Sequence, residues 1–397
     1  MKDTKHTIKM ELITPVHIGN GNFLYNNIDY IVEKDKIYVI DVQKVFEKIG
    51  YDEKLIQTWV TKAEKGYNIM QIFPRGRITK LKDVSQRVIP IKYNNKKENK
   101  LKECLHDGMG IAYIPGSSIK GAIRSALMGS LAQKARKDKL NNCEKDVFGA
   151  GPYCEFMRFI QVGDAYFEKG CECATKATSI NIRETEELLA TNLEQAIECI
   201  DLYTTTFSIK LSKSYNEKAV QEGMKKKENE KEPTPIKPLP QEVSDIGNLF
   251  KTINAHTLRL INEDIDFWEN FGESSWEKYM NRFSDDDKKN TKDYIDALYI
   301  IKDVIEESTL EGDACVLRIG YASGWKFMTG SWITDEKELK ETEISVRERK
   351  DKKDGKITNN YTHLPFPKTR RVEEFVDEDS DEIKLGLLGF VKLKIMK

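Results

Sequence analysis

Residues 114–127, with the sequence IPGSSIKGAIRSAL, combine a predicted turn with the start of an apolar helix. Ser117 or Ser118 is the predicted helix cap. Lys120 and Arg124 are four residues apart and therefore lie on one stripe of the helix. The free amides of the first helical turn, the helix dipole and these two cations all favour an anion. The segment is thus a candidate phosphate cradle.

The spacing of this segment excludes the common nucleotide-binding loop. A Walker loop needs Lys and then Ser or Thr directly after its last glycine, but Gly121 is followed by Ala122. The segment therefore does not indicate ATP binding. A capped amphipathic helix with ordinary surface cations stays open as the alternative, because helix starts that suit an anion are common.

A second loop with glycines follows the first predicted strand. In the sequence PVHIGNG, His17 precedes Gly19, Asn20 and Gly21, and glycine lets a ligand approach the backbone closely. A lone histidine is more often structural than catalytic, because acid–base chemistry needs a positioned partner. Since this loop and the one at Gly116 both follow strands, we expect them to share a binding surface.

The third candidate is LRIGYASGWKFMTG, in which Gly320 and Gly324 stand among aromatic residues and precede Lys326. Such a loop can let a base stack while the backbone meets a phosphate. The spacing does not match the dinucleotide-binding fingerprint. The alternative is a glycine-rich turn with aromatic side chains in the core. The aromatic residues are Tyr321, Trp325 and Phe327.

A short basic cluster, PKTRR, contains Lys368, Arg370 and Arg371. Such clusters are mostly solvated surfaces, but they contact phosphates well when they lie beside a groove. We include the three cations among the candidate RNA-binding residues.

The sequence indicates neither a metal centre nor a catalytic set, and no cofactor is expected. The spacing of four nearby cysteines does not match paired C-x-x-C ligands, so ordinary thiols are favoured over zinc. These are Cys143, Cys154, Cys171 and Cys173. Asp164 in VGDAYF has no second carboxylate nearby and is predicted to be a turn or capping residue rather than a metal ligand or base.

Composition describes a folded protein with segregated charge. The 397 residues are 39% hydrophobic and 32% charged, with a formal net charge of −1. Residues 117–140 nevertheless carry six basic residues against one acid, so a balanced total can conceal a basic groove. The N-terminal residues do not resemble a signal peptide, and no apolar run suits a membrane span. We expect a cytoplasmic protein with no membrane partner.

The predicted elements alternate between helices and strands, which indicates an α+β fold of antiparallel sheets packed by helices. We predict two units, residues 1–187 and 188–397, with a mobile, charged, proline-rich loop at 225–241. Residues 92–103 are polar and are also predicted to be a loop. The main predicted helices are 42–49, 53–65, 117–135, 243–270 and 291–308.

Four motifs in this order resemble the RAMP superfamily of CRISPR proteins: PVHIGNG, IPGSSIKGAIRSAL, VGDAYF and a glycine-containing turn with LLGFVKLKI. The order and the length are most similar to the fifth-subunit family of type III-A (Csm) effector complexes. This resemblance implies two ferredoxin-like (RRM-type) modules with large insertions. It also implies a position at the end of the backbone filament, beside the helical backbone subunit, where the protein contacts the 3′ part of the crRNA.

The resemblance favours a non-catalytic RNA-binding subunit that supports crRNA maturation and antiviral defence, with trimming by recruited host nucleases. It places His17 and residues 19–21 in the loop after the first strand, and residues 320–324 in the glycine-rich loop of the second module. Two alternatives stay open. One is a RAMP endoribonuclease that processes repeat RNA with His17 as acid or base. The other is the helical backbone subunit, which cleaves target RNA with an Asp and Mg²⁺.

Overall fold

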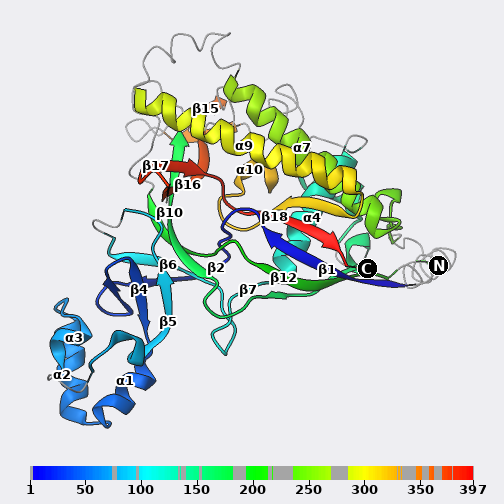
Figure 1. The fold of residues 1–397 in the computed structure, drawn as a ribbon. Coiled ribbons are helices and arrows are strands. Elements are labelled where there is room, and N and C mark those ends of the chain that lie inside the picture. Colours follow the sequence, from blue (N-terminus) through cyan, green and yellow to red (C-terminus); the bar gives the residue numbers. More distant parts are fainter. Residues whose placement is uncertain are drawn as a thin grey trace.

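The computed structural model has an α+β architecture in which helices cover two large sheets (Figure 1). It describes residues 3–73, 78–94, 98–132, 135, 140–151, 154–181, 194–212, 217, 236–269, 285–328, 330, 332, 346–350, 357–361, 369–377 and 379–396. The predicted fold class, α+β with antiparallel sheets packed by helices, is confirmed at this level.

The first sheet has five strands in the order β13-β18-β1-β12-β8, and every neighbouring pair is antiparallel. In β1 the alternate residues Ile8, Met10 and Leu12 are buried, as expected for a strand with one face on the core. The strands are β1 (Thr4–Leu12), β8 (Ile160–Val162), β12 (Thr204–Leu211), β13 (Ala314–Arg318) and β18 (Phe390–Ile395).

Helices pack on the first sheet and form most of the core. Ile123 of α4 (Gly116–Leu131) and Ile253 of α7 (Ile246–Glu269) belong to the same buried cluster as the core residues of β1. α9 (Asp285–Glu311) runs beside α7 and belongs to a second cluster with Val316 and Phe390 (Figure 1). A shorter helix, α5 (Leu140–Phe148), follows α4.

The second sheet has six strands in the order β17-β16-β10-β11-β6-β2. Its pairs are antiparallel except for β11 and β6, which are parallel. The strands are β2 (Gly19–Tyr25), β6 (Lys100–Cys104), β10 (Glu172–Asn181), β11 (Gln195–Ile200), β16 (Thr369–Val376) and β17 (Ile383–Gly386).

Residues between β2 and β6 form a small lobe at the lower left of Figure 1. A three-stranded sheet packs with short helices around a separate buried cluster that includes Val45, Ile49 and Val84. β3 and β4 form a hairpin in which Glu33 pairs with Lys36. The elements are β3 (Tyr30–Glu33), β4 (Lys36–Ile40), β5 (Ser85–Pro90), α1 (Val42–Ile49), α2 (Glu53–Ala63), α3 (Ile69–Ile72) and the 3-10 helix η1 (Leu81–Val84).

Two strand pairs and short helical turns complete the described elements. They are β7 (Tyr113–Ile114) with β9 (Ala165–Tyr166), β14 (Val346–Lys350) with β15 (Ile357–Tyr361), α10 (Gly324–Phe327), and the 3-10 helices η3 (Phe156–Phe159) and η5 (Gln241–Val243). None of the helices in the described ranges is long and apolar enough to span a membrane.

The sheets do not divide at residue 187/188. Each large sheet joins strands from both sides of that position, because β1 pairs with β12 and β18, and β10 pairs with β16. The prediction of a loop at 92–103 is wrong at its C-terminal end, where β6 buries Leu101 and Cys104 between charged neighbours. Most of the predicted loop at 225–241 lies outside the described residues, and residue 241 begins η5.

Candidate nucleic-acid interface

The loop after β1 and the loop after β13 are joined directly. The backbone N–H of Tyr321 donates a hydrogen bond of 2.9 Å to the carbonyl oxygen of His17. Gly320 has a φ of +76°, and a Cβ there would lie 2.5 Å from the same carbonyl oxygen. Glycine is therefore required at position 320 by both the backbone conformation and the close contact.

A pocket of about 450 Å³ lies where these two loops meet the side of α4. It brings together four of the candidate residues, namely His17, Gly19, Ser118 and Gly320. The first turn of α4 and the loop at His17 thus lie close together, and Ser118 rather than Gly116 lines the pocket. The lining also includes Gly121, Ala122, Ser125, Glu144, Arg318, Tyr321, Ser323, Phe327 and Met328.

Two cations flank the aromatic ring of Tyr321 at this pocket. The Nζ atom of Lys102 lies 4.3 Å from the ring centroid, and the Cζ atom of Arg371 lies 5.4 Å from it. His17 meets the same ring edge-on, with centroids 5.5 Å apart. Burial and the nearby Arg371 lower the pKa of Lys102. The group formed by Lys102, Tyr321 and Arg371, which we call the Tyr321 cluster, unites an aromatic face with cations.

The start of α4 differs from the prediction, because neither Ser117 nor Ser118 caps it. Pro115 holds the cap position, and its side chain makes no hydrogen bond to the helix. Instead the Oδ1 atom of Asp164 accepts a hydrogen bond of 2.7 Å from the Gly116 amide. This carboxylate comes from the loop after β8, which confirms the predicted capping role of Asp164. The first amide of the helix therefore already holds an anionic group.

The two cations of the predicted cradle have different surroundings. Arg124 forms an ion pair of 2.8 Å with Glu155, and its Cζ atom lies 3.8 Å from the centroid of Phe148. A second carboxylate, that of Glu144, lies 3.7 Å away. Lys120 has no ion pair with any residue in the described part of the chain, and burial together with Arg124 lowers its pKa. Arg124 thus packs in the α4–α5 region with its charge paired, and its contact with a phosphate stays a prediction.

These surroundings predict that charge reversal affects RNA binding at Lys120 and folding stability at Arg124. Lys120→Glu is expected to weaken RNA binding about 5-fold with little change in thermal stability, because the half-buried Lys120 has no ion pair within the described residues to lose. Arg124→Glu is expected to lower the free energy of unfolding by about 1–3 kcal/mol, because a third carboxylate would face Glu155 and Glu144. Fluorescence anisotropy with labelled RNA and thermal unfolding of both variants measure the two effects. Equal losses of stability would contradict this assignment.

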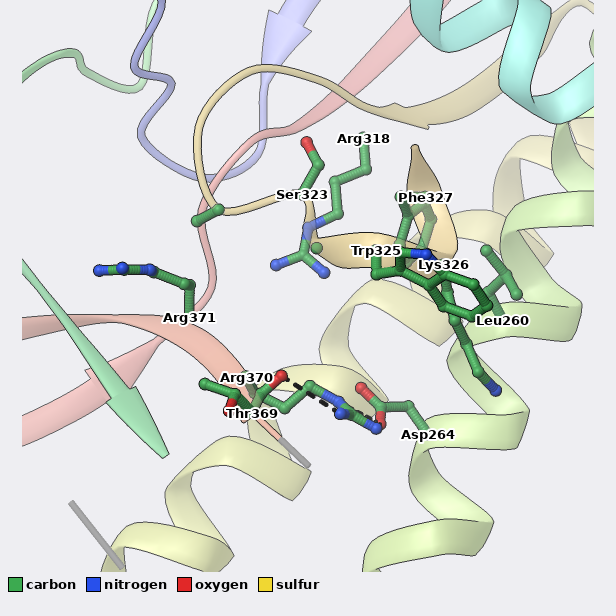
Figure 2. Close-up of a pocket in the computed structure, with 12 residues that line it drawn as sticks. Leu260, Asp264, Arg318, Ser323, Trp325, Lys326, Phe327, Thr369, Arg370 and Arg371 are labelled. Carbon is green, nitrogen blue, oxygen red and sulfur yellow. Dashed lines mark hydrogen bonds and ion pairs between the residues drawn. The ribbon is translucent and has the colours of Figure 1, made fainter. Parts of the chain in front are cut away.

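A smaller pocket of about 180 Å³ adjoins the first and contains the other candidate cations (Figure 2). Gly324, Lys326, Arg370 and Arg371 line it. Lys326 forms an ion pair of 2.6 Å with Glu263 of α7. The predicted basic cluster is therefore not simply a solvated face, and Lys368 lies outside the described residues.

The guanidinium of Arg370 is paired inside this pocket. It lies 2.7 Å from the carboxylate of Asp264, as Figure 2 shows, and 5.2 Å from the ring centroid of Phe267. Burial alone would raise the pKa of Asp264, but Arg370 holds it below the ordinary value. Arg370 therefore shapes the pocket through a structural ion pair.

His17 is held in a neutral, buried state. Its Nδ1 atom lies 2.6 Å from the carbonyl oxygen of Glu198 and must donate to it, so the ring proton is on Nδ1. Burial, together with a smaller effect of Lys102, lowers the pKa of His17 to about 4, although the hydrogen bond to Glu198 acts in the opposite direction. No residue in the described ranges hydrogen-bonds to Nε2. At neutral pH His17 therefore carries no proton on Nε2 to give to a leaving group.

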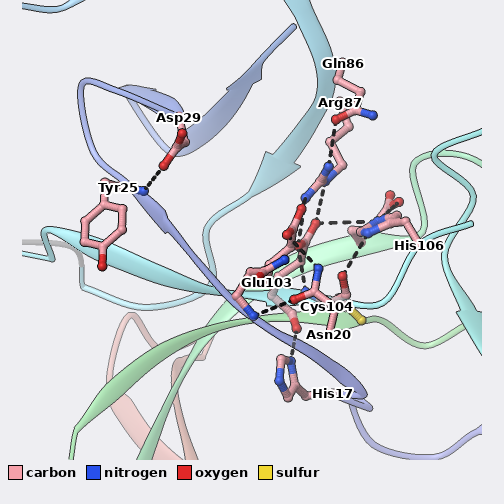
Figure 3. Close-up of polar contacts among 12 residues, drawn as sticks. His17, Asn20, Tyr25, Asp29, Gln86, Arg87, Glu103, Cys104 and His106 are labelled. Carbon is pink, nitrogen blue, oxygen red and sulfur yellow. Dashed lines mark hydrogen bonds and ion pairs between the residues drawn. The ribbon is translucent and has the colours of Figure 1, made fainter. Parts of the chain in front are cut away.

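A buried polar network lies behind His17 (Figure 3). The guanidinium of Arg87 bonds to Glu198 at 2.7 Å and to Glu103 at 3.0 Å. Asn20, one of the predicted RNA-binding residues, donates to Glu103 at 2.7 Å. Gly21 is exposed, and residues 19–21 begin β2 rather than forming the expected loop. The network thus anchors the start of β2 beside the larger pocket.

The same network contains donors that could hold a metal ion. Carboxylate and imidazole atoms of Glu103, His106 and Glu198 lie within 4.8 Å of one another. Arg87 already compensates both carboxylates, so a cation would have to displace its guanidinium. The four cysteines considered for zinc belong to no such donor group within the part of the chain that the structure describes.

Two functional candidates, Lys102 and Arg318, were absent from the sequence prediction. Lys102 was hidden in the segment read as a loop, since the apolar residues Leu101 and Cys104 are three apart and do not show the period-2 alternation that signals a strand. Arg318 ends β13 next to Gly320, and only its burial in three dimensions distinguishes it from a surface arginine.

Comparison with known proteins agrees with this architecture. Residues 9–394 match the model of the RAMP superfamily, and the chain therefore belongs to that superfamily. The protein is most like Csm5 proteins. "CRISPR system Cms protein Csm5" of Streptococcus thermophilus is 28% identical over 192 residues, which cover 42% of this chain and 53% of that protein.

A second curated relative, also called Csm5, comes from Methanocaldococcus jannaschii. It is 26% identical over 178 residues, covering 40% of this chain and 42% of that protein. The chain thus spans about half the length of the curated relatives it matches.

Two solved structures share the fold. A chain of a Csm–crRNA–target RNA ternary complex from a type III-A CRISPR-Cas system has a TM-score of 0.58 and 16% identity, with 99% of this chain and 100% of that chain covered. The crystal structure of T. onnurineus Csm5 has a TM-score of 0.53 and 17% identity, with coverage of 81% and 92%. At these identities the likeness concerns the fold alone.

Proposed function

We propose that the protein is a non-catalytic RNA-binding subunit of a type III-A CRISPR (Csm) effector complex. In this proposal it caps the backbone filament, contacts the helical backbone subunit and other Csm subunits, and holds the crRNA near its 3′ end. The observation that carries the proposal is the larger pocket, where two strand-end loops and the side of α4 meet the Tyr321 cluster. The likeness to Csm5 proteins supports the placement in such a complex.

The chemistry of this surface suits RNA of any sequence. Lys102 and Arg371 supply phosphate contacts that carry no base information. Tyr321 offers a ring on which a base can stack, and stacking tolerates every base because each has a π-face. A subunit that must hold crRNAs with different spacers needs this sequence tolerance.

The topology supports the expectation of a ferredoxin-like module. Along the chain β1, α4, β8, β12, α7 and β18 follow the β-α-β-β-α-β order of that fold, and their strands are neighbours in one sheet. We propose that these elements form the first module and that the second sheet belongs to the other. In this arrangement the small lobe between β2 and β6 is an insertion.

The endoribonuclease alternative needs an acid or base at the pocket. His17 has a pKa of about 4 and donates its one ring proton to Glu198, so it is a poor general acid near pH 7. The described surface offers binding groups around the pocket, and we propose that any trimming of the bound crRNA is done by recruited nucleases.

One experiment tests binding and cleavage together. The purified full chain is titrated with two unrelated labelled single-stranded RNAs of equal length, in chelator and at several salt concentrations. We expect affinities within about 3-fold of each other and a linear fall of log affinity with log salt, by about 0.7 per phosphate contact. The RNA should stay intact. A discrete cut that His17→Ala abolishes would establish the endoribonuclease instead, and failure to bind RNA would refute the proposal.

A further inference from the structure

Arg318 is a buried arginine whose charge has no carboxylate partner. Arg318 is the last residue of β13 and is only 6% exposed. The Nε atom donates to the carbonyl oxygen of Leu388 at 3.1 Å. Across the described residues no Asp or Glu oxygen lies within 4.0 Å of its guanidinium, whereas Arg87 and Arg370 each bond to a carboxylate.

Aromatic rings compensate part of this charge. The guanidinium carbon lies 4.7 Å from the ring centroid of Phe390 and 5.2 Å from that of Phe327. Such cation–π contacts offset only part of the cost of removing an ion from water. Within the described residues, the two terminal nitrogens of Arg318 donate no hydrogen bond to a protein acceptor, and they face the space of a pocket.

These nitrogens point into the smaller pocket. Figure 2 shows the Arg318 side chain reaching from the end of β13 into the space among Arg371, Thr369 and Lys326. Four cationic side chains and one carboxylate line this pocket; Arg370 pairs with Asp264 and Lys326 with Glu263, which compensates two of the four cations. The buried guanidinium is therefore aimed at a space with an excess of positive charge.

Arg318 also stands at the junction of both pockets. Together with Ser323 and Phe327 it lines the larger pocket as well as the smaller one. A strand that follows the larger pocket past the Tyr321 cluster would reach the guanidinium where the two spaces meet.

We propose that Arg318 binds a single phosphate group of the RNA strand in the smaller pocket. This inference rests on the proposed RNA-binding function and narrows it to one specific contact. A phosphate supplies the missing negative charge, and the planar guanidinium fork binds phosphate oxygens in a bidentate manner. The pocket, at about 180 Å³, is below the roughly 300–1,000 Å³ of small-molecule sites, so it suits one phosphate and its sugar rather than a larger ligand.

The test combines neutral linkages in the RNA with variants of the full chain. A short labelled RNA is synthesised as a series, each member with one phosphate replaced by an uncharged methylphosphonate, and a further pair ends in a 3′-phosphate or a 3′-hydroxyl. Affinities are measured by anisotropy for the wild type, Arg318→Lys and Arg318→Gln. Lys54→Gln, on the exposed surface of α2, is the control for loss of one charge.

We expect one position in the series at which the neutral group weakens wild-type binding about 10-fold. Arg318→Gln should weaken binding of the unmodified RNA by a similar factor and should be insensitive to the change at that position, because the two changes remove the same contact. Arg318→Lys should be intermediate, and Lys54→Gln should behave as wild type. The sensitive position distinguishes an internal linkage from a terminal phosphate.

An even profile across the series, or unaltered binding by Arg318→Gln, would overturn the inference and leave the proposed function standing. If Arg318→Gln does not fold, the wild-type series still decides, since a single sensitive phosphate is required. A wild-type chain that binds no RNA would refute both the function and the inference.

Discussion

Reversing both cations of the Tyr321 cluster, with Lys102→Glu and Arg371→Glu in one chain, is expected to lower RNA affinity about 100-fold at low salt. Two phosphate contacts are lost, and two carboxylates would then repel the strand at the same place. A 100-fold change corresponds to about 2.8 kcal/mol, since each 1.4 kcal/mol is a factor of ten. This is larger than the effect expected at Lys120, because both charges act across one ring.

The salt dependence gives a second reading of the same variant. Loss of two phosphate contacts should reduce the slope of log affinity against log salt by about 1.4, at about 0.7 per contact on a single strand. The matched control reverses two exposed lysines of the small lobe, Lys54→Glu with Lys65→Glu. It changes the net charge equally, so an equal loss of affinity in the control would mean that overall charge, and not the Tyr321 cluster, attracts the RNA. Circular dichroism and thermal unfolding verify that both chains fold.

The elements that could be predicted from the sequence are those formed by local patterns. The alternation of Ile8, Met10 and Leu12 marks β1, and the three- and four-residue spacing of Ile119, Ala122 and Ile123 marks α4. The resemblance to the RAMP superfamily also depended on local motifs at loop positions, and the family match bears it out.

The errors concern partners that are far apart in the sequence. Asp164 accepts a hydrogen bond from the Gly116 amide, 48 residues away in the sequence. Arg124 pairs with Glu155, 31 residues away. Lys120 and Arg124 do lie on one stripe of the helix, but within the described residues only Arg124 forms an ion pair. The sequence also could not show that the first amide of α4 is bonded to a carboxylate of the same chain.

The division into units 1–187 and 188–397 stays a prediction, but the pairing of strands across that boundary could not be seen in the sequence. A strand pattern predicts a strand but not its neighbours, and here β1 pairs with β18 at the other end of the chain. The burial of Arg318 is equally invisible in the sequence, because its neighbours Phe390 and Leu388 come from the last strand and the loop before it. The glycine-containing loops thus indicated where the candidate surface lies, but the sequence could not show which of its charged groups are paired within the protein.

The second large effect concerns the network behind the pocket. Arg87→Met is expected to lower the free energy of unfolding by about 3–5 kcal/mol, because Glu198 is fully buried and would lose the cation that compensates it. Burial opposes the charge on Arg87, but the pairing with Glu198 and Glu103 holds its pKa above the ordinary value. Arg87 lies in β5 of the small lobe and Glu198 in β11 of the second sheet, so the ion pair also fixes the lobe to the body.

A second substitution separates the cost of an unpaired buried charge from the cost of lost packing. Adding Glu198→Gln to Arg87→Met should recover about 1–3 kcal/mol, because an amide oxygen can still accept from the Cys104 amide, now 3.0 Å from the carboxylate, while no buried charge remains. The control is Lys48→Met, which removes an exposed ion pair with Asp83 in the same lobe and should cost less than about 1 kcal/mol. Denaturant unfolding measures all four chains. If the second substitution deepens the loss instead, the cost of Arg87→Met arises from the packing of its side chain, and the buried carboxylate is stabilised by its hydrogen bonds without the arginine.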